Sequence, residues 1–385
     1  MLPFLDRFRS YEPITFSRPG SPHVSIIVIT YNKWKYTYEC LKSLHETVSK
    51  IPYELIIVDN ASSDGTPERL SLFEGAIIMR NNTNTGFIRA CNQAAGRANG
   101  MYLYFLNNDT ILHEDTLAAL LRRMESDSHI GAVGSKIIFA NNKLQEAGSM
   151  LWKDGSATGY GRGDNPHLSQ YTFARPVDFC SGASLLVRKS IYDECGGFDL
   201  RYEPAYYEEA DLCMKIWDKA KTVMYEPESV ITHREYGSST PAQAVEMMKQ
   251  NHSRLHERWK DDLAHRPMPS DPLASLYNRD RRNGHRIALV DVLPEVREHI
   301  HQFMTHARHH RFTLFTDHIP QSVQQHLQYA QIEVQPLNAM TSFRTKKETY
   351  FTDVFCLPTM IPQDRDVRKH LEVYTSVTDL FADLR

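Results

Sequence analysis

The segment Asn107-Asn108-Asp109 follows the apolar run from Met101 to Leu106. A carboxylate that closes a strand can share a Mg²⁺ or Mn²⁺ ion with diphosphate oxygens, because both cations accept oxygen ligands. Such an ion neutralises a departing diphosphate and acts as the Lewis acid of a transfer reaction. Asp109 is the only ionised side chain of the three, so we predict that it is the metal ligand.

A second acidic group, Glu208, Glu209 and Asp211, lies within four positions. Repulsion among three carboxylates raises at least one pKa toward that of a useful general base. At helical spacing Glu208 and Asp211 share a face, and Glu209 projects elsewhere. The alternative is the first turn of a helix, where the helix dipole favours acids. That alternative accounts for the charge but not for the flanking loop Gly196–Asp199.

Polar side chains end three of the predicted strands, at the edge of a parallel sheet where ligands bind. The three groups are Thr30-Tyr31-Asn32, Asp59-Asn60 and Asn107-Asn108-Asp109. Asn and Asp are also ordinary turn formers. Three such groups on one edge, followed by helix starts that contain Gly, favour a nucleotide site. One histidine, His233, follows another short strand, and alone such a residue is more often structural than a ligand.

The elements that must position these residues alternate regularly over the first 135 residues. Apolar runs rich in β-branched residues predict strands, and stripes of apolar residues at helical spacing predict helices. Expected strands are 24–30, 53–58, 76–79 and 101–106, and expected helices are 34–49, one after the polar turn 59–66, 86–99 and 114–124. This alternation predicts an α/β fold, with a mostly parallel sheet that helices flank on both faces.

The pattern loosens over residues 140–175, which we interpret as an insertion or a loop-rich floor. We then expect a strand at 179–187, a helix at 206–220, a short strand at 221–225 and a charged helix at 241–263. Prolines and the charge run 279–282 indicate a linker. The predicted domains are a lead-in at 1–21, a main domain at 22–264, a linker at 265–284 and a small α/β domain at 285–385.

The small domain begins with an expected strand at 286–292, a helix at 295–309 and a strand at 311–316. It holds nine of the 18 histidines, but none is paired with carboxylates at metal-ligand spacing, so we interpret them as surface residues. No phosphate-binding glycine loop is present, because Gly284 is the last glycine. We therefore expect a non-catalytic role. The alternatives are half of a second catalytic domain, an acceptor-docking platform or an oligomerisation element.

Composition sets the outer bounds on function. The chain has 385 residues, enough for two or three domains, and its net charge of −3 disfavours nucleic-acid binding. The longest purely apolar run, 101–106, is far shorter than a membrane helix, and the first 20 residues lack a signal-peptide core. Six scattered cysteines without a CxxC pair suit reduced thiols. We expect a soluble cytoplasmic protein; peripheral attachment to the inner membrane face is an alternative, with Arg254, Arg258 and Lys260 as candidates.

Eight motifs stand in an order that resembles family 2 glycosyltransferases, the inverting nucleotide-sugar enzymes with the GT-A fold. They are TYN, VDNASSDGT, NTGFxxxxN, NND, SGASLLVRKS, GGFD, EEADLC and HxxxGS. The resemblance covers about residues 22–260 and is greatest to the rhamnosyltransferase-like, non-processive branch that builds bacterial surface polysaccharides. It implies a GT-A-type nucleotide-diphospho-sugar transferase fold, and it says nothing about residues 285–385.

The resemblance also implies roles for single residues in donor binding. Asp59 matches the acid that reads the base, and Asp64 belongs to the same loop. Gly86 and Asn92 match the segment that flanks the sugar nucleotide. The first nucleotide-contacting loop corresponds to Thr30, Tyr31 and Asn32.

The same resemblance implies a metal site and a base. Asn107-Asn108-Asp109 matches the DxD-type metal motif, although Asn stands where Asp is usual, so the metal depends mainly on Asp109. Glu209 matches the catalytic base, with Glu where Asp is commoner, and Glu208 and Asp211 would support it. His233 matches the histidine that can complete the metal site.

Together these features predict a glycosyltransferase that depends on Mg²⁺ or Mn²⁺ and inverts the anomeric centre. It would move one sugar from a UDP- or dTDP-linked donor to a hydroxyl of a glycan or lipid-linked acceptor in surface polysaccharide assembly. Processive synthases carry a QxxRW motif and membrane helices. Residues 255–259 read LHERW, without the Gln, which favours a single addition.

Two other functions remain open at this point. A sugar-1-phosphate nucleotidyltransferase needs a glycine-rich loop after the first strand, and the residues after Thr30 contain none. A catalytically silent protein that binds nucleotide sugars or serves as a scaffold in glycan assembly is the second alternative. The set of Asp109, Glu209 and His233 argues against it, and a turnover assay separates the two.

Overall fold

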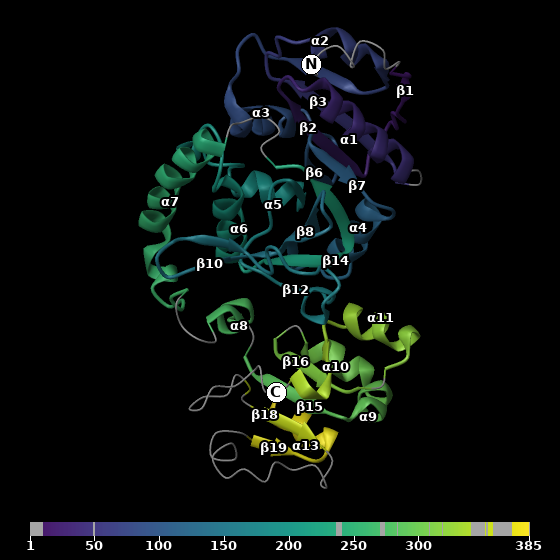
Figure 1. Cartoon of the computed structure of the whole chain (residues 1–385), viewed down its shortest axis with the longest axis vertical. Coiled ribbons are helices and arrows are strands. Elements are labelled where there is room, and N and C mark those ends of the chain that lie inside the picture. The colour runs from purple at the N-terminus through teal and green to yellow at the C-terminus, as the bar shows by residue number, and fades with distance from the viewer. Residues whose placement is uncertain are drawn as a thin grey trace.

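The computed structural model has two α/β units, a larger one that holds the predicted site and a smaller one at the C-terminal end (Figure 1). It describes residues 11–48, 51–235, 241–269, 274–282, 284–307, 309–317, 319–339, 351, 353–356 and 372–384. Two residues of the HxxxGS motif, Gly237 and Ser238, therefore lie outside the described residues.

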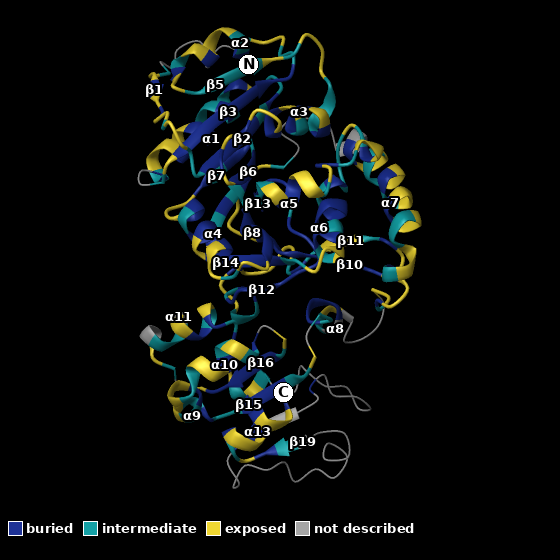
Figure 2. Ribbon diagram, turned by 180° about the vertical axis from the view of Figure 1, so that it is seen from behind, coloured by how far each residue is buried: buried dark blue, intermediate teal, exposed yellow. Residues whose placement is uncertain are grey.

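Four parallel strands form one half of the central sheet, as the apolar runs predict. They lie in the order β6-β2-β3-β5, and their bounds are β2 (Val24–Thr30), β3 (Tyr53–Asp59), β5 (Ile77–Arg80) and β6 (Tyr102–Asn107). Neighbours along a strand point to opposite faces. Ile27 and Ile56 therefore belong to one hydrophobic cluster, and Ile26 and Ile57 to the other. Both faces are thus covered, which Figure 2 shows as buried strands between partly exposed helices.

The other half of the sheet is mixed. Strand β13 (Ser184–Arg188) lies antiparallel between β6 and β8 (Ile130–Phe139), and β14 (Thr222–His233) lies parallel to β8. The prediction of a short strand at 221–225 is wrong in length, because β14 continues through a register shift between Glu226 and Val230. His233 is therefore the last residue of a strand and does not follow one.

The helices of the larger unit match the predicted ones within a few residues, except α5, which was not predicted. The match is complete for α7, which runs along the outer edge of this unit in Figure 1. The helices are α1 (Trp34–Thr47), α2 (Thr66–Arg69), α3 (Gly86–Ala95), α4 (Thr116–Glu125), α5 (Lys189–Glu194), α6 (Glu208–Asp218) and α7 (Pro241–Leu263).

The segment predicted as a loop-rich floor contains short strands and is well buried, especially over 144–151. Strand β9 pairs with β8, β10 pairs with β11, and β12 pairs with β14. The bounds of the remaining short elements are β1 (Ile14–Thr15), η2 (Leu70–Leu72), β4 (Phe73–Glu74), β7 (Thr110–Leu112), β9 (Leu144–Ala147), β10 (Ser149–Leu151), β11 (Ala157–Gly159), η3 (Ser169–Tyr171), β12 (Arg175–Pro176) and η4 (Leu200–Tyr202).

The smaller unit has a parallel sheet in the order β17-β16-β15-β18-β19. The helix expected at 295–309 is divided into α9 and α10, because His299 leaves helical geometry at φ −108° and ψ 22°. The bounds are β15 (Arg286–Val290), α9 (Leu293–Glu298), α10 (Ile300–His306), β16 (Arg311–Phe315), α11 (Gln321–Tyr329), β17 (Glu333–Gln335), β18 (Asp353–Cys356), β19 (Glu372–Tyr374) and α13 (Val377–Asp383).

The described part of the segment predicted as a linker is packed against both units. It contains α8 (Ala274–Arg279), and Arg266 and Arg279 are almost fully buried. Arg266 donates to the Asp178 carboxylate of the larger unit at 2.6 Å, and Arg279 donates to Glu333 of the smaller unit at 2.9 Å. The segment with Arg266 and Arg279 therefore connects the two units. The domain limits themselves stay a prediction.

Candidate functional site

The loops that follow β2 and β3 are joined by the side chain of Asn32. Its Oδ1 accepts hydrogen bonds from the backbone N–H groups of Ser63, at 2.7 Å, and Asp64, at 3.1 Å. Asp59 is buried at the end of β3 and accepts the N–H of Ser62 at 3.0 Å. Asp64 accepts the N–H of Thr66, the first residue of α2. The predicted nucleotide residues of these two loops therefore lie together.

The ends of β2 and β6 are both attached to Thr37 of α1. Its hydroxyl lies 2.8 Å from that of Thr30 and accepts the side-chain amide of Asn108 at 3.0 Å. The carbonyl of Asn107 accepts the hydroxyl of Thr110 at 2.7 Å. Thr30 and Asn108 therefore shape this edge of the sheet, and half-buried Tyr31 follows directly after β2.

Gly86 brings the start of α3 against the loop that leads to α6. Its φ is +81°, and a Cβ atom there would lie 2.9 Å from the Cβ of Pro204. The next residue, Phe87, donates its N–H to the Pro204 carbonyl at 3.0 Å. Only glycine fits this position without strain.

Asn92 makes its side-chain hydrogen bonds within the protein. Its Nδ2 donates to the Phe198 carbonyl at 2.8 Å, and its Oδ1 accepts the Phe198 N–H at 3.0 Å and the Tyr192 hydroxyl at 2.6 Å. Both ends of the amide are thus engaged within the protein. Asn92 therefore holds the loop around Gly197.

The predicted metal ligands Asp109 and His233 come together. The His233 Nε2 lies 3.2 Å from an Asp109 carboxylate oxygen, and both side chains are buried. Antiparallel pairing of β14 with β7 sets His233 opposite Thr110, which explains how residues so distant in sequence meet. The other ring nitrogen of His233 lies 3.1 Å from Gln145 Oε1, which fixes the orientation of the ring.

This pair fits a divalent cation whose coordination a ligand completes. Among the residues that the structure describes, no three His, Cys, Asp or Glu side chains are grouped closely enough to hold a metal by themselves. One carboxylate oxygen and one imidazole nitrogen leave most coordination positions to other oxygens. A diphosphate can supply such oxygens.

The predicted base, Glu209, stands in the first turn of α6. It is half-buried, and its Oε2 is a buried atom with no hydrogen-bond partner. Burial raises the pKa of Glu209 to about 7, and the nearby Glu146 carboxylate adds to this rise. Burial, together with the charge of Glu209, also raises the pKa of Glu208 well above its usual range. The carboxyl of Glu209 can therefore exchange a proton near neutral pH.

Glu146 is a site residue that the sequence analysis missed. It is buried on β9 and accepts the Ser181 N–H at 3.0 Å and the Ser149 hydroxyl at 2.9 Å. Burial raises its pKa, while the neighbouring His233 ring, when charged, lowers it. The Glu146 carboxylate therefore interacts electrostatically with both His233 and Glu209. No local motif marked it within the irregular stretch 140–175.

Asp211 does not take the predicted supporting place beside Glu209. Its carboxylate is fully buried and accepts Trp259 Nε1 at 2.9 Å, Arg258 Nε at 3.0 Å and the Tyr202 hydroxyl at 3.1 Å. Asp211 therefore anchors α7 to α6, on the side of the helix away from Glu209. Of the two predicted supporting acids, Glu208 is the one that interacts with the base.

Two of the three cations considered for membrane attachment are engaged within the protein. Arg254 donates to the Arg201 carbonyl at 2.7 Å, and Arg258 donates to the carboxylate of Asp199 at 2.8 Å. Lys260 is exposed. In the described part of the chain, no helix is both long and apolar enough to cross a membrane.

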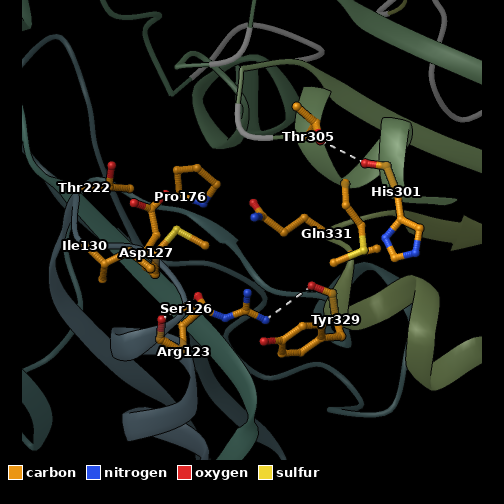
Figure 3. A pocket seen from close by; sticks show the side chains of 13 residues that line it. Arg123, Ser126, Asp127, Ile130, Pro176, Thr222, His301, Thr305, Tyr329 and Gln331 are labelled. Atoms are coloured by element: carbon orange, nitrogen blue, oxygen red, sulfur yellow. Dashed lines mark hydrogen bonds between the residues drawn. The ribbon is translucent and has the colours of Figure 1, made fainter.

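A cavity of about 340 Å³ lies between the two units and away from the site described above. Figure 3 shows its walls, which come from α4, β14 and their neighbours on one side and from α10 and α11 on the other. It contains none of the predicted site residues. Of the predicted site residues, Asp109 follows β6, His233 ends β14 and Glu209 lies in the first turn of α6.

Residues 25–196 match the model of the family described as Glycosyl transferase family 2. N-acetylglucosaminyl-diphospho-decaprenol L-rhamnosyltransferase of Mycobacterium tuberculosis is 24% identical over 237 residues, which cover 56% of this chain and 76% of that protein. The uncharacterized protein y4gI of Sinorhizobium fredii is 23% identical over 269 residues, and this chain spans only 29% of its length.

Among solved structures, the crystal structure of GalNAc-T7 with UDP, GalNAc and Mn²⁺ superposes with a TM-score of 0.51 at 16% identity. The alignment covers 63% of this chain and 49% of that one. This likeness shows that the larger unit has a GT-A fold. The family match includes Asp59 and Asp109 and ends before Glu209 and His233.

Proposed function

Residues 25–196 constitute a Glycosyl transferase family 2 domain, and from that premise we propose that this protein is a metal-dependent, inverting glycosyltransferase. It transfers a single sugar from a UDP- or dTDP-linked donor to a hydroxyl of a glycan or lipid-linked acceptor in surface polysaccharide assembly. The observation that carries the proposal is the contact between Asp109 and His233, together with the Glu146 carboxylate, which interacts with both His233 and Glu209.

In this mechanism the ionised Glu209 takes the proton from the acceptor hydroxyl. The freed oxygen attacks the anomeric carbon of the donor, and the bond from that carbon to the diphosphate oxygen breaks. One displacement from the opposite face inverts the anomeric centre. A pKa of about 7 suits this task, because much of the carboxyl is ionised at neutral pH and still basic enough to accept a proton.

The donor binds along the ends of β2, β3 and β6 in this proposal. Asp59 and the loop around Asn32 contact the nucleoside, and Asp109 and His233 hold the cation. When bound, the cation neutralises the negative charge of the diphosphate. The need for a cation is supported by the charge of the site, because Asp109, Glu146 and Glu209 would otherwise repel an anionic donor. The GalNAc-T7 structure holds UDP and Mn²⁺, which agrees with this assignment.

The name of one relative supports a class of acceptor. The name of the mycobacterial relative specifies a sugar linked through a diphosphate to decaprenol. We therefore favour a lipid-linked acceptor, reached from the cytoplasmic side of the membrane. Since Arg254 and Arg258 are engaged within the protein, peripheral attachment would need other residues.

The second candidate function is a silent protein that binds nucleotide sugars without transfer. The unpartnered Oε2 of Glu209 argues against it, because a merely structural carboxylate would have a partner there. Turnover of a nucleotide sugar by the wild-type protein would exclude this alternative.

Calorimetric titration with UDP and with dTDP, with and without Mn²⁺, tests the donor site. We expect metal-dependent binding of one of the two, and a loss of at least about tenfold in that affinity for Asp109→Ala, which removes the only carboxylate of the metal pair. Asp218→Ala, an exposed acid at the end of α6, is the matched control and should bind as wild type does. Unchanged metal-dependent affinity in Asp109→Ala would remove this residue from the metal site.

A further inference from the structure

The loop that leads to Glu209 is held by a residue of α7 that takes no part in the proposed chemistry. Asn251 is 1% exposed, and its Nδ2 donates to three carbonyl oxygens of that loop. The distances are 2.7 Å to Tyr202, 2.9 Å to Ala205 and 2.9 Å to Tyr206. A single amide group thus binds three carbonyl oxygens within the five residues 202–206.

The held loop has an unfavourable backbone conformation. Tyr206 has φ +75° and Tyr207 has φ +74°, a region that bulky L-residues rarely occupy. Two successive residues of this kind persist only where the surroundings hold them there. Asn251 contacts the carbonyl of the first of the two, so it is well placed to supply that constraint.

The strained turn directs backbone N–H groups toward the acids of the site. The N–H of Tyr206 faces the carboxylate of Glu208, and the N–H of Tyr207, with those of Glu209 and Ala210, faces that of Glu209. These N–H groups lower the pKa of Glu209 and oppose the larger effect of burial. The direction in which the Glu209 carboxylate points therefore depends on how this turn is held.

The orientation of the Asn251 amide is unambiguous. Its Oδ1 accepts Nη1 of Arg254 at 2.8 Å, and a guanidinium can only donate. The same Nη1 donates to the Arg201 carbonyl at 2.7 Å. Since the oxygen must face the arginine, the NH₂ group must face the three carbonyls, and no residue without a side-chain donor can replace it.

We propose that Asn251 is a positioning residue for the base: its amide holds the turn at Tyr206 and Tyr207 in the conformation that presents the Glu209 carboxylate to the acceptor. This inference rests on the proposed role of Glu209. It extends the functional site beyond the part of the chain that the family model matches, into a helix at the edge of the molecule (Figure 1).

Asn251→Leu tests the proposal, because leucine has nearly the same shape and no donor. We expect kcat to fall at least about tenfold, while the affinity for the nucleoside diphosphate with Mn²⁺ stays within about twofold of wild type. The acid limb of the rate profile should move to higher pH, since Glu209 loses N–H groups that favour its charged form. The other titratable groups that face Glu209 are Glu208, Glu146, Tyr207 and Cys213, and all of them remain.

Gln250→Ala is the matched control, because Gln250 is exposed on the same helix and its side chain contacts Glu246. It should leave both kcat and the rate profile unchanged. If Asn251→Leu does not fold, Asn251→Ser carries the test, since serine keeps one donor. Its kcat should lie between those of wild type and of Glu209→Gln.

A folded Asn251→Leu, or in its place Asn251→Ser, with wild-type kcat and an unmoved acid limb would overturn the proposal. A failure of the underlying mechanism looks different. In that case Glu209→Gln itself would turn over normally, whatever the Asn251 variants do.

Discussion

At the scale of single residues, several carboxylates of the site lower the stability of the folded chain. Glu209 keeps a buried oxygen without a partner beside two other buried acids, Glu146 and Glu208. Such an arrangement destabilises the folded chain when the acids are ionised, and it is typical of functional sites.

The pH dependence of stability checks this cost. The pKa of Glu209 is about 7 in the folded chain and ordinarily 4.5, so the folded state binds its proton more tightly. The contribution of this carboxyl to the free energy of unfolding is therefore fully present below pH 4.5. It is lost as the pH rises from 4.5 to about 7. Glu209→Gln escapes this loss. We expect equal stability at pH 4 and a gain on the order of 2 kcal/mol for the variant at pH 8, measured by urea unfolding. A variant less stable than wild type at pH 8 would contradict the assigned environment.

Some site residues could be predicted from the sequence, because their residue type and their position in a local pattern indicate their chemistry. Asp109 and Glu209 were predicted because an acid after a strand and acids at a helix start are local patterns, and the structure brings Asp109 against His233. Glu146 and Asn251 could not be predicted. Their partners lie far away along the chain, so their roles exist only in the folded molecule.

At the scale of elements, close packing of α3 against the loop before α6 depends on Gly86. A methyl group there would lie 2.9 Å from Pro204 Cβ and 3.1 Å from its carbonyl oxygen, at a φ of +81°. Neither the loop backbone nor the proline ring can easily move aside. The loop that this contact supports continues into the turn before Glu209.

We therefore expect Gly86→Ala to lower the free energy of unfolding by about 1–3 kcal/mol, for backbone strain together with crowding. It should also lower the transfer rate. Gly96→Ala at the other end of the same helix is the control, because Gly96 has φ −66° and its nearest neighbours to a new Cβ lie 3.6 Å away. Thermal unfolding of both variants decides; equal melting temperatures for Gly86→Ala and wild type would refute the packing argument.

The sequence predicted the elements whose pattern is uniform. Continuous runs of β-branched residues gave the parallel strands correctly, because both faces of each strand are buried. The length of β14 was missed, since Pro227 and Glu228 interrupt its apolar pattern where the register shifts. The break between α9 and α10 leaves no Gly or Pro as a signal in the sequence.

At the scale of the whole molecule, buried ion pairs attach the segment between the two units to the smaller unit. Arg279 donates to Glu333 and to Asp280, and Arg311 donates to Asp280 at 3.1 Å, all four side chains being almost fully buried. Phe173 of the larger unit lies against the guanidinium of Arg311, 4.7 Å from its ring centroid. Packing of this kind favours a fixed arrangement of the units over a flexible tether.

Arg279→Ala should lower the free energy of unfolding by about 3–5 kcal/mol, because it leaves the Glu333 carboxylate buried without its main cationic partner. The exposed Arg297 on α9 provides the control, and Arg297→Ala should stay within about 0.5 kcal/mol of wild type. Urea unfolding measures both. A loss below 1 kcal/mol for Arg279→Ala would mean that the junction contributes little to the stability of the molecule.

Release of nucleoside diphosphate from the sugar donor, followed against pH for wild type and Glu209→Gln, decides whether Glu209 is the base. The account predicts that kcat/KM of the wild type rises with pH and levels off above about 7, as Glu209 becomes ionised. For the variant it predicts a kcat lower by about 10²- to 10⁴-fold with nearly unchanged donor binding. A variant that retains the wild-type rate and the wild-type pH limb would show that Glu209 is not the base.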